Sequence, residues 1–315
     1  MRVTSKKILI TGGAGFIGSH LAERLIKEEH RVTIIDNFIS GNKENLKGLK
    51  VEIIKADIID KLKLPNFDQI YHLASLASPV FFQKYPIETA LTNSIGTYHL
   101  LVEAKKHKSR ILFASSSEIY GNPLEHPQKE EYWGNVNPIG PRACYDESKR
   151  LGETLMTDFH REYGLETRIA RIFNTYGPKM SQSDGRVISN FITQALEDEP
   201  ITIFGEGKQT RSFCYISDTA EGLIRLMNSD YQEPVNLGNP DEITTLELAE
   251  KIKELTNSKS KIVFKELPKD DPERRRPDIS KAKNILNWEP KVSLEDGLKI
   301  TIDWFKNRLE KTEKV

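Results

Sequence analysis

The sequence has few cysteines and no excess charge of either sign. Its 315 residues include only two cysteines, Cys144 and Cys214, and 46 basic residues balance 46 acidic ones. Two cysteines argue against a disulfide framework and favour a reducing, cytoplasmic setting. A net charge of zero gives no indication of a nucleic acid or an anionic membrane as a partner.

Long apolar runs and metal-ligand spacings are also missing. No uninterrupted apolar stretch approaches the roughly 20 residues that a membrane-spanning helix needs, and the N-terminus leaves no room for a signal-peptide core. The seven histidines show no HExxH spacing, and neither cysteine belongs to a CxxC pair. We therefore expect a cytoplasmic protein with no membrane association and no structural or catalytic metal.

The first half of the chain alternates between short apolar strands and amphipathic helices. Strands are expected at residues 8–10, 32–35, 51–54, 70–73, 111–114 and 167–170, and helices at residues 15–28, 87–106 and 143–163. This alternation predicts an α/β fold with a doubly wound parallel sheet. After about Asn174 the pattern becomes irregular, although residues 235–237 could return to the main sheet.

A glycine-rich loop lies where the first strand becomes the first helix, in the sequence TGGAGFIG from Thr11 to Gly18. Gly12 allows the tight turn, Gly15 lets a pyrophosphate approach the backbone, and Gly18 lets the helix pack on the strand. The helix N-terminus offers free N–H groups to phosphates. Asp36 ends the second strand, where a carboxylate accepts ribose hydroxyls and disfavours a 2′-phosphate. The pattern predicts a Rossmann-type domain that prefers NAD to NADP.

A tyrosine and a lysine four residues apart, Tyr145 and Lys149, share one face of the helix expected at residues 143–163. An ammonium beside a phenol favours the phenolate, and so should lower a pKa that is about 10 in free tyrosine. Such a tyrosine can take a proton from a substrate hydroxyl while hydride leaves the same carbon. Ser116 could hydrogen-bond that hydroxyl, and Glu118 is a candidate acid–base group. Taken alone, three consecutive serines are typical of a loop and an isolated glutamate of a solvated surface.

The glycine loop, the stretch SSSEIYG and the motif YDESK together resemble the extended short-chain dehydrogenase/reductase family, which acts on nucleotide sugars. Longer segments narrow the match to the UDP-glucuronate decarboxylase (UDP-xylose synthase) family. These segments are residues 71–75, 137–150, 171–178, 184–191, 209–213 and 275–279. The similarity extends from about Lys6 to about Phe305.

The resemblance implies a redox-neutral reaction on UDP-glucuronate with tightly held NAD⁺. Tyr145, helped by Lys149 and Ser116, would remove the proton of the 4-hydroxyl while C4 gives hydride to the nicotinamide. The 4-ketone is β to the C6 carboxylate, so loss of CO₂ leaves the electrons on an enolate. Protonation at C5 and return of the hydride would give UDP-xylose, with no net oxidation.

The resemblance also assigns roles to individual residues. Glu118 is expected to act near C5, and Arg275 to handle the carboxylate or the C5 protonation, although a basic run such as residues 274–276 commonly forms a solvated face. Ser117 stands where related 4,6-dehydratases carry an aspartate, which argues against dehydration. The expected catalytic residues are Tyr145, Lys149, Ser116, Glu118 and Arg275. The expected substrate-binding residues are Ser117, Glu118, Asn174, Asn190, Gln209, Arg211, Tyr215 and Arg275.

The cofactor is expected along the carboxyl ends of the strands. Asp57, after the third strand, fits an adenine contact and a simple turn residue equally well. The expected cofactor-binding residues are Gly12, Gly15, Phe16, Ile17, Gly18, Asp36, Asn37, Asp57, Ile58, Leu73, Ala74, Ser75, Thr92, Ser115, Tyr145, Lys149, Thr175 and Arg186.

The same resemblance divides the chain and suggests an assembly. Residues 1–175 would form the NAD-binding domain, with a return segment around 213–240, and residues 176–315 mainly a nucleotide-sugar-binding lobe. The helices at 87–106 and 143–163 would pair with their copies in a four-helix bundle, giving a homodimer. Three alternatives stay open: a UDP-sugar 4-epimerase, a decarboxylase that releases a UDP-4-keto-pentose, and a non-catalytic protein that senses NAD or nucleotide sugars.

Overall fold

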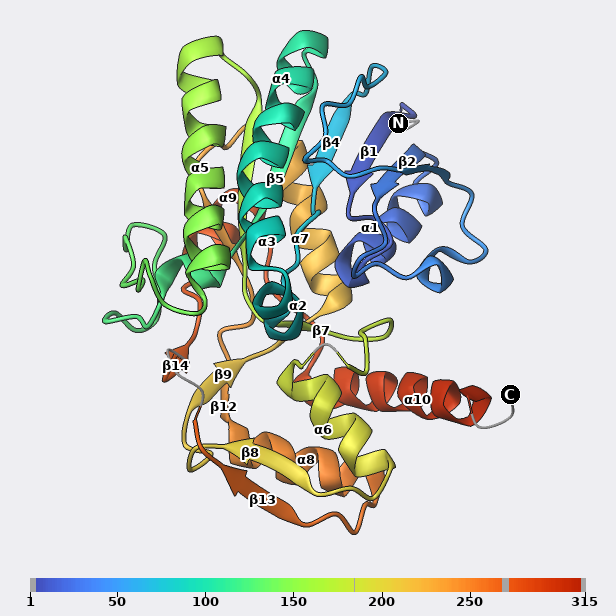
Figure 1. The fold of residues 1–315 in the computed structure, drawn as a ribbon, viewed down its shortest axis with the longest axis vertical. Coiled ribbons are helices and arrows are strands. Elements are labelled where there is room, and N and C mark those ends of the chain that lie inside the picture. Colours follow the sequence, from blue (N-terminus) through green and yellow to red (C-terminus); the bar gives the residue numbers. More distant parts are fainter. Residues whose placement is uncertain (1–3, 184, 268–271, 313–315) are drawn as a thin grey trace.

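A sheet of seven parallel strands forms the centre of the larger part of the molecule (Figure 1). The computed structural model describes residues 4–183, 185–267 and 272–312. In spatial order the strands are β11 (Val235–Leu237), β6 (Thr167–Ile172), β5 (Arg110–Ser116), β4 (Gln69–His72), β1 (Lys7–Thr11), β2 (Arg31–Asp36) and β3 (Glu52–Lys55). The predicted α/β class with a doubly wound parallel sheet is confirmed. Residues 235–237 do return to the sheet, as the strand beside β6.

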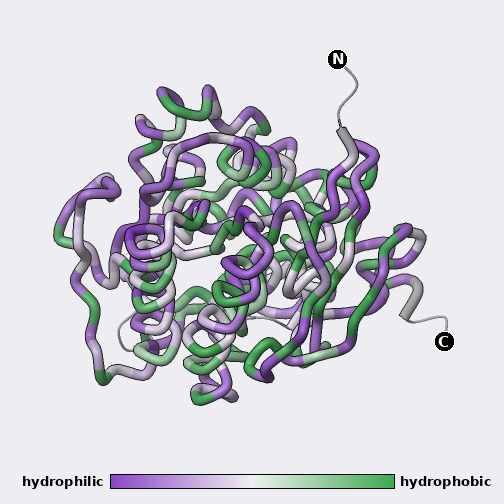
Figure 2. Tube along the Cα trace, turned by 90° about the horizontal axis from the view of Figure 1, so that it is seen from above, coloured by the Kyte–Doolittle hydropathy of each residue, from purple (hydrophilic) through white to green (hydrophobic). Residues whose placement is uncertain are grey.

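Helices cover both faces of this sheet. One face carries α1 (Phe16–Lys27), α7 (Ile216–Asn228) and α9 (Ser280–Leu286), and the other carries α3 (Pro86–Leu91), α4 (Thr97–His107) and α5 (Ala143–Tyr163). Ile8 and Ile10 of β1 pack into the first layer and Leu9 into the second. Because both directions lead to buried surface, the strand is an unbroken apolar run. Along the helices, hydrophilic and hydrophobic stretches alternate (Figure 2).

The helix expected at residues 87–106 is interrupted by a π-helical turn, Thr92–Gly96, between α3 and α4. A Cβ at Gly96 would lie 2.7 Å from the Ile58 side chain, so the turn packs closely on the segment after β3. Asn93 donates a 3.0 Å hydrogen bond to the Ser148 hydroxyl of α5. Sequence periodicity did not reveal this turn, because its cause is packing against distant residues. Turns of this kind are frequent at functional sites.

The smaller lobe has a core of its own. Its helices are α6 (Val187–Leu196), α8 (Thr245–Thr256) and α10 (Leu294–Thr312), which pack on the strand pair β8 (Ile201–Phe204) and β13 (Ile262–Lys265). A three-stranded sheet of β12 (Glu242–Thr244), β9 (Thr210–Ser212) and β14 (Arg274–Arg275) lies between the two parts, and β7 (Thr175–Tyr176) pairs with β10 (Cys214–Tyr215). No described helix combines the length and apolarity needed to cross a membrane.

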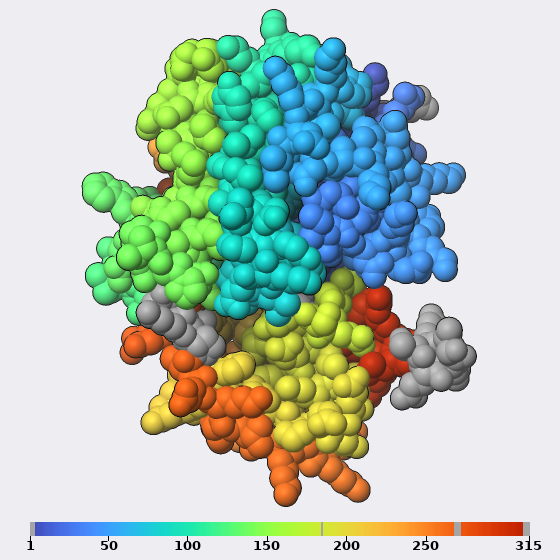
Figure 3. All heavy atoms as spheres, in the orientation of Figure 1, coloured from blue at the N-terminus to red at the C-terminus, as the bar shows by residue number. Residues whose placement is uncertain are grey.

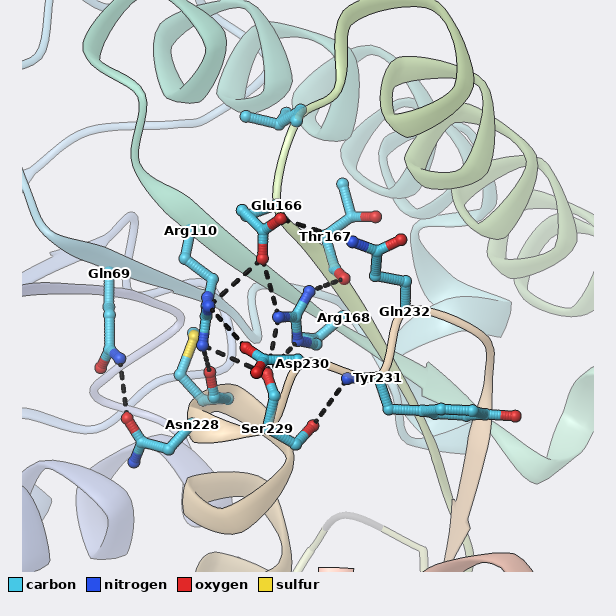
Figure 4. A network of polar contacts seen from close by, with 12 residues as sticks. Gln69, Arg110, Glu166, Thr167, Arg168, Asn228, Ser229, Asp230, Tyr231 and Gln232 are labelled. Carbon is cyan, nitrogen blue, oxygen red and sulfur yellow. Dashed lines mark hydrogen bonds and ion pairs between the residues drawn. The ribbon is translucent and has the colours of Figure 1, made fainter. Parts of the chain in front are cut away.

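A network of polar contacts ties the amino ends of β5 and β6 to the end of α7 (Figure 4). The buried guanidinium of Arg168 donates to the carbonyl oxygens of Ser229 and Thr167 at 2.6–2.8 Å. Arg110 donates to the Met227 carbonyl at 3.0 Å, and Glu166 accepts from both arginines. These cations satisfy carbonyl groups that the end of a helix leaves without partners.

Candidate active site

One cavity of about 1120 Å³ lies at the carboxyl ends of the strands, where the larger part meets the lobe. The molecular surface is indented along this junction (Figure 3). Every residue predicted above as catalytic, cofactor-binding or substrate-binding lines this cavity, with the exception of Tyr215. Helices α1, α5 and α6 and the ends of several strands, far apart in the sequence, therefore bring the predicted site together in space.

The glycine loop forms one wall of the cavity. Gly12 has φ +70°, and a Cβ there would meet the Ala74 backbone at 2.7 Å. A Cβ at Gly18 would lie 2.4 Å from the Gly12 carbonyl oxygen, so the close approach of helix and loop requires glycine. No side chain caps the N-terminus of α1 at Gly15. This cradle of backbone at an uncapped helix N-terminus fits the pyrophosphate of a dinucleotide.

Two acidic residues, one at the end of β2 and one just after β3, form hydrogen bonds within the loops beside the glycine-rich loop. Asp36 accepts hydrogen bonds from the backbone N–H groups of Ala14 and Phe38, at 2.9 and 2.8 Å. Burial raises its carboxyl pKa, against the opposing effect of these two bonds. Asp57 accepts from Ile59 N and from the Asn37 side chain. Asp57 is thus a turn residue that also lines the cavity, and its contact with adenine stays a prediction.

Tyr145 and Lys149 lie one turn apart on the buried face of α5. The Lys149 ammonium donates a 2.8 Å hydrogen bond to the Ala114 carbonyl and lies 5.7 Å from the centroid of the Tyr145 ring. Burial lowers the pKa of Lys149 to about 7. Burial also raises the pKa of Tyr145 to about 12, although a hydrogen bond from Ser116 opposes the rise. The predicted depression of the tyrosine pKa is therefore wrong for this structure, because desolvation of the phenolate outweighs neighbouring charge.

Glu118 lies between two guanidinium groups. Its Oε2 is 2.6 Å from Arg142, and its Oε1 is 3.4 Å from Arg275. Although burial acts to raise the Glu118 pKa, the charges of Arg275 and Arg142 lower it to about 2. Arg275 is only 2% exposed, unlike its exposed neighbour Arg274, so this part of the basic run is not a solvated face. Alternation along strand β14 explains the difference.

Arg275 also keeps unused hydrogen-bonding capacity. Its Nη2 donates to the Gly121 carbonyl at 2.9 Å and to Glu118 at 3.4 Å, and Nη1 makes the 3.4 Å ion-pair contact with Glu118, whereas Nε is buried without a hydrogen-bond partner among the described residues. A buried donor without a partner carries a free-energy cost unless a ligand satisfies it. Since Arg275 lines the cavity, its Nε donor indicates a site for an anion or another strong acceptor.

Sequence reasoning missed two residues of this site, Phe82 and Arg142. The Phe82 ring stacks on Tyr145, with centroids 5.5 Å apart and planes inclined by 17°, and the Arg142 guanidinium lies 5.5 Å from the same ring. Arg142 precedes Tyr145 by three residues, a spacing that places side chains on one helix face and could have drawn attention to it. Nothing in the sequence around Phe82, in the short helix α2 (Pro79–Lys84), distinguishes its ring from ordinary core.

The lobe contributes the remaining wall. Arg211 of β9 pairs in register with Arg275 of β14, so both arginines belong to neighbouring strands at the cavity. Tyr215 does not line the cavity. Its ring packs edge-on against Tyr176 at 5.5 Å and occupies the space beside Gly297, where a Cβ would lie 2.8 Å from it. The substrate contact of Tyr215 stays a prediction that the cavity lining does not support.

Comparisons with known proteins extend over the whole chain. A family model described as GDP-mannose 4,6 dehydratase matches residues 9–301. UDP-glucuronic acid decarboxylase 1 of Arabidopsis thaliana is 55% identical over 307 residues, which cover 96% of this chain and 70% of the plant protein.

Solved structures share the fold of both parts. The UDP-glucose 4-epimerase of Thermotoga maritima, determined with UDP-glucose, has a TM-score of 0.90 and 33% identity, covering 96% of this chain and 99% of that one. The UDP-glucuronic acid 4-epimerase of Bacillus cereus, in complex with UDP-glucuronic acid and NAD, has a TM-score of 0.85 and 29% identity over 96% of this chain and 99% of that one.

Proposed function

The chain belongs to the GDP-mannose 4,6 dehydratase family and, within it, to the UDP-glucuronic acid decarboxylases, and from this premise we propose that it converts UDP-glucuronate into UDP-xylose with NAD as cofactor. The observation that carries the proposal is Arg275, whose Nε is buried at the cavity without a hydrogen-bond partner among the described residues, and whose Nη1 makes only a 3.4 Å ion-pair contact with Glu118. A guanidinium is well matched to a carboxylate. The C6 carboxylate distinguishes UDP-glucuronate from neutral UDP-hexoses.

The first step is oxidation at C4, for which Tyr145 and Ser116 handle the proton. The phenol is held by the Phe82 stack, and the Ser116 hydroxyl lines the same cavity, so both hydroxyls can meet the sugar O4. Protonated Lys149, on the same helix face, favours the phenolate that accepts the O4 proton. Bound NAD⁺ would supply the hydride acceptor at C4, return the hydride at the end, and add positive charge beside the phenol.

The second step is loss of CO₂ from the 4-keto sugar. The ketone at C4 is β to the carboxylate, so the electrons of the broken bond are delocalised as an enolate. Arg275 and Arg142 form ion pairs with the Glu118 carboxylate. Together these three charged side chains set the electrostatic environment of C5 and C6 of the bound sugar. Because Glu118 has a pKa of about 2, it is ionised at neutral pH and acts on C5 as a carboxylate, not as the stored proton donor.

Dehydration, the activity in the family model's description, is not supported by the site. It would need an acid to expel water, and the residue after Ser116 is Ser117. Ser117 is buried in the cavity wall, and its hydroxyl cannot replace a carboxylic acid as a proton donor near neutral pH.

The test is to incubate purified protein with UDP-glucuronate and NAD⁺, following nucleotide sugars by mass spectrometry and NADH by absorbance. Loss of one CO₂ without standing NADH is the expected result. Accumulation of NADH would indicate release of a UDP-4-keto-pentose instead. An unchanged substrate mass would overturn decarboxylation, and a changed C4 configuration would then establish the epimerase alternative.

The assignment of roles to cavity residues and of the two parts to NAD and UDP-sugar belongs to the same proposal. It also includes a homodimer formed through a four-helix bundle. Helices α3, α4 and α5 lie side by side (Figure 1) and carry exposed apolar side chains, among them Ile87, Tyr98 and Leu151. A monomeric mass in light scattering at micromolar concentration would refute the dimer, and Leu151→Glu should weaken it. A cytoplasmic location is supported by two free cysteines.

A further inference from the structure

A buried ion pair outside the predicted site joins strand β6 to helix α5. Arg171 of β6 binds the carboxylate of Glu153 with both forks of its guanidinium, Nε to Oε1 at 3.0 Å and Nη2 to Oε2 at 2.8 Å. Their side chains are only 10% and 12% exposed. Burying two charges costs desolvation energy, and replacing such a pair by apolar residues is often neutral for stability. Stability alone is therefore a weak reason for this pair.

Glu153, the acidic residue of the pair, binds the end of strand β5. The Ser115 hydroxyl donates a 2.5 Å hydrogen bond to Glu153. One turn earlier on α5, Lys149 donates to the carbonyl of Ala114. Two consecutive residues at the end of β5 are thus bound by two side chains of α5. The next residue along the strand is Ser116, so these bonds fix the start of the segment 116–118 relative to the helix of Tyr145.

Arg171, the basic residue of the pair, binds the chain just after the segment 116–118. Nη1 of Arg171 donates to the Tyr120 hydroxyl at 2.9 Å, and that hydroxyl donates to the Asn236 side chain of β11 at 2.8 Å. Tyr120 is the last residue of the short 3₁₀ helix η3 (Ser117–Tyr120), which carries Glu118. Arg171 and Glu153 therefore reach both ends of the segment that bears Ser116, Ser117 and Glu118.

We propose that Glu153 and Arg171 are positioning residues that hold the segment 116–118 in register with Tyr145 and Lys149. The inference rests on the proposed function, because it takes Ser116, Glu118 and Tyr145 as the reacting groups. The pair acts on geometry: with the ends of the segment released, the Ser116 hydroxyl and Glu118 carboxylate lose their fixed distance to the phenol. A displacement of about 1 Å can reduce the rate about 100-fold. The negative charge of Glu153 also opposes the lowering of the Lys149 pKa by burial.

The test is the double variant Glu153→Leu/Arg171→Met, which removes both charges and leaves apolar side chains of similar size. Its melting temperature should fall moderately, since loss of a complete buried pair is often neutral but the Ser115 hydroxyl and the Glu130 carbonyl also lose a hydrogen-bond partner. We expect kcat for CO₂ release from UDP-glucuronate to fall by about 100-fold, with KM changed by no more than about threefold. A folded double variant with wild-type kcat would overturn the proposal, and so would a loss confined to KM.

The matched control is Arg168→Met. Arg168 is a buried arginine of the same strand, but it lies near the amino end, in the network of Figure 4, and does not line the cavity. It should lose stability and keep kcat. If the double variant does not fold, Tyr120→Phe replaces it as the test. This variant removes only the hydroxyl that accepts the Arg171 hydrogen bond and should lower kcat by about tenfold. An unchanged kcat in Tyr120→Phe would overturn the proposal. A wild type that releases no CO₂ would refute the proposed function instead, and positioning would then be read from its epimerisation of UDP-glucose.

Discussion

The aromatic ring of Phe82 lies stacked on that of Tyr145, with centroids 5.5 Å apart and planes inclined by 17°. Both rings are buried, and Phe82 comes from α2 whereas Tyr145 comes from α5. Packing against an aromatic neighbour restricts the phenol to one orientation. The proposed base is thus held by contacts on its ring, so the packing of the ring can be tested separately from proton transfer by the hydroxyl.

Tyr145→Phe should abolish turnover and leave UDP binding nearly intact. The substitution keeps the ring and its stack on Phe82 but removes the hydroxyl that accepts the O4 proton. CO₂ release by mass spectrometry and UDP affinity by calorimetry measure the two effects separately. Tyr231→Phe, which removes a hydroxyl that donates to Glu233 and does not line the cavity, is the control and should keep full activity. Retained activity in Tyr145→Phe would refute the proposed base.

Arg142→Gln should weaken the binding of UDP-glucuronate more than that of UDP-glucose. The guanidinium lies 2.6 Å from Glu118 and lines the cavity, so it can pair with a sugar carboxylate but gains nothing from a neutral C6. A charge-assisted hydrogen bond is worth about 1.5–3 kcal/mol, which corresponds to an affinity loss of about 10–100-fold. Calorimetry with both nucleotide sugars measures the difference.

The matched control for Arg142→Gln is Arg274→Gln, the exposed neighbour of Arg275, which should bind both sugars normally. Equal weakening of the two sugars by Arg142→Gln would show that Arg142 only supports Glu118. Unchanged affinity for both would show that the carboxylate does not reach it.

Local sequence signals predicted the frame of the site well. Helix α5 has the predicted bounds, Ala143–Tyr163, because an amphipathic pattern ends there at Gly164, which adopts the left-handed conformation that glycine favours. The glycine loop lies at the predicted junction of β1 and α1, since a Cβ at Gly12 or Gly18 would approach backbone atoms to within 2.7 or 2.4 Å. Both features depend on residues close together in the chain.

The features that sequence analysis missed depend on distant contacts. Tyr215 packs against Tyr176 and lies beside Gly297 of α10, contacts that its place in the sequence does not reveal. Arg275 is buried because β14 pairs with β9, a pairing that spans more than sixty residues of sequence. The pKa of Tyr145 rises because the phenol is desolvated by the assembled site, and spacing on one helix cannot report how much solvent remains. Motifs of neighbouring residues thus could not predict burial or the pairing of distant strands.

Asp146→Asn should change the pH dependence of stability. Asp146 is buried, its Oδ1 has no hydrogen-bond partner among the described residues, and burial with the charge of Glu118 raises its carboxyl pKa from 3.8 to about 8. A group whose pKa is higher in the folded state stabilises the fold fully below its unfolded pKa. That contribution is lost between about pH 4 and about pH 8, at up to about 1.4 kcal/mol per pH unit.

Asparagine stays neutral at every pH, so the unfolding free energy of Asp146→Asn relative to the wild type should increase from about pH 4 to about pH 8 and then level off. Urea denaturation at a series of pH values measures this difference. Glu147→Gln, on the exposed side of the same helix turn, is the control and should show no such trend. A constant difference between Asp146→Asn and the wild type would contradict the raised pKa.

Arg168→Met should destabilise the fold without slowing the reaction. The side chain is fully buried and donates hydrogen bonds to the Ser229 and Thr167 carbonyl oxygens, so methionine leaves these acceptors without their cation. Removing one partner of a buried charged network costs about 2–4 kcal/mol of unfolding free energy.

Arg161→Met is the control, because Arg161 is 73% exposed and such surface changes stay within about 0.5 kcal/mol. The network lies at the amino ends of β5 and β6, opposite the cavity, so kcat should be unchanged wherever the variant is folded. A stability loss no larger than that of Arg161→Met would show that the arginine is not needed to hold α7 on the sheet, and a lower kcat in the folded variant would show that this end of the sheet is coupled to the site.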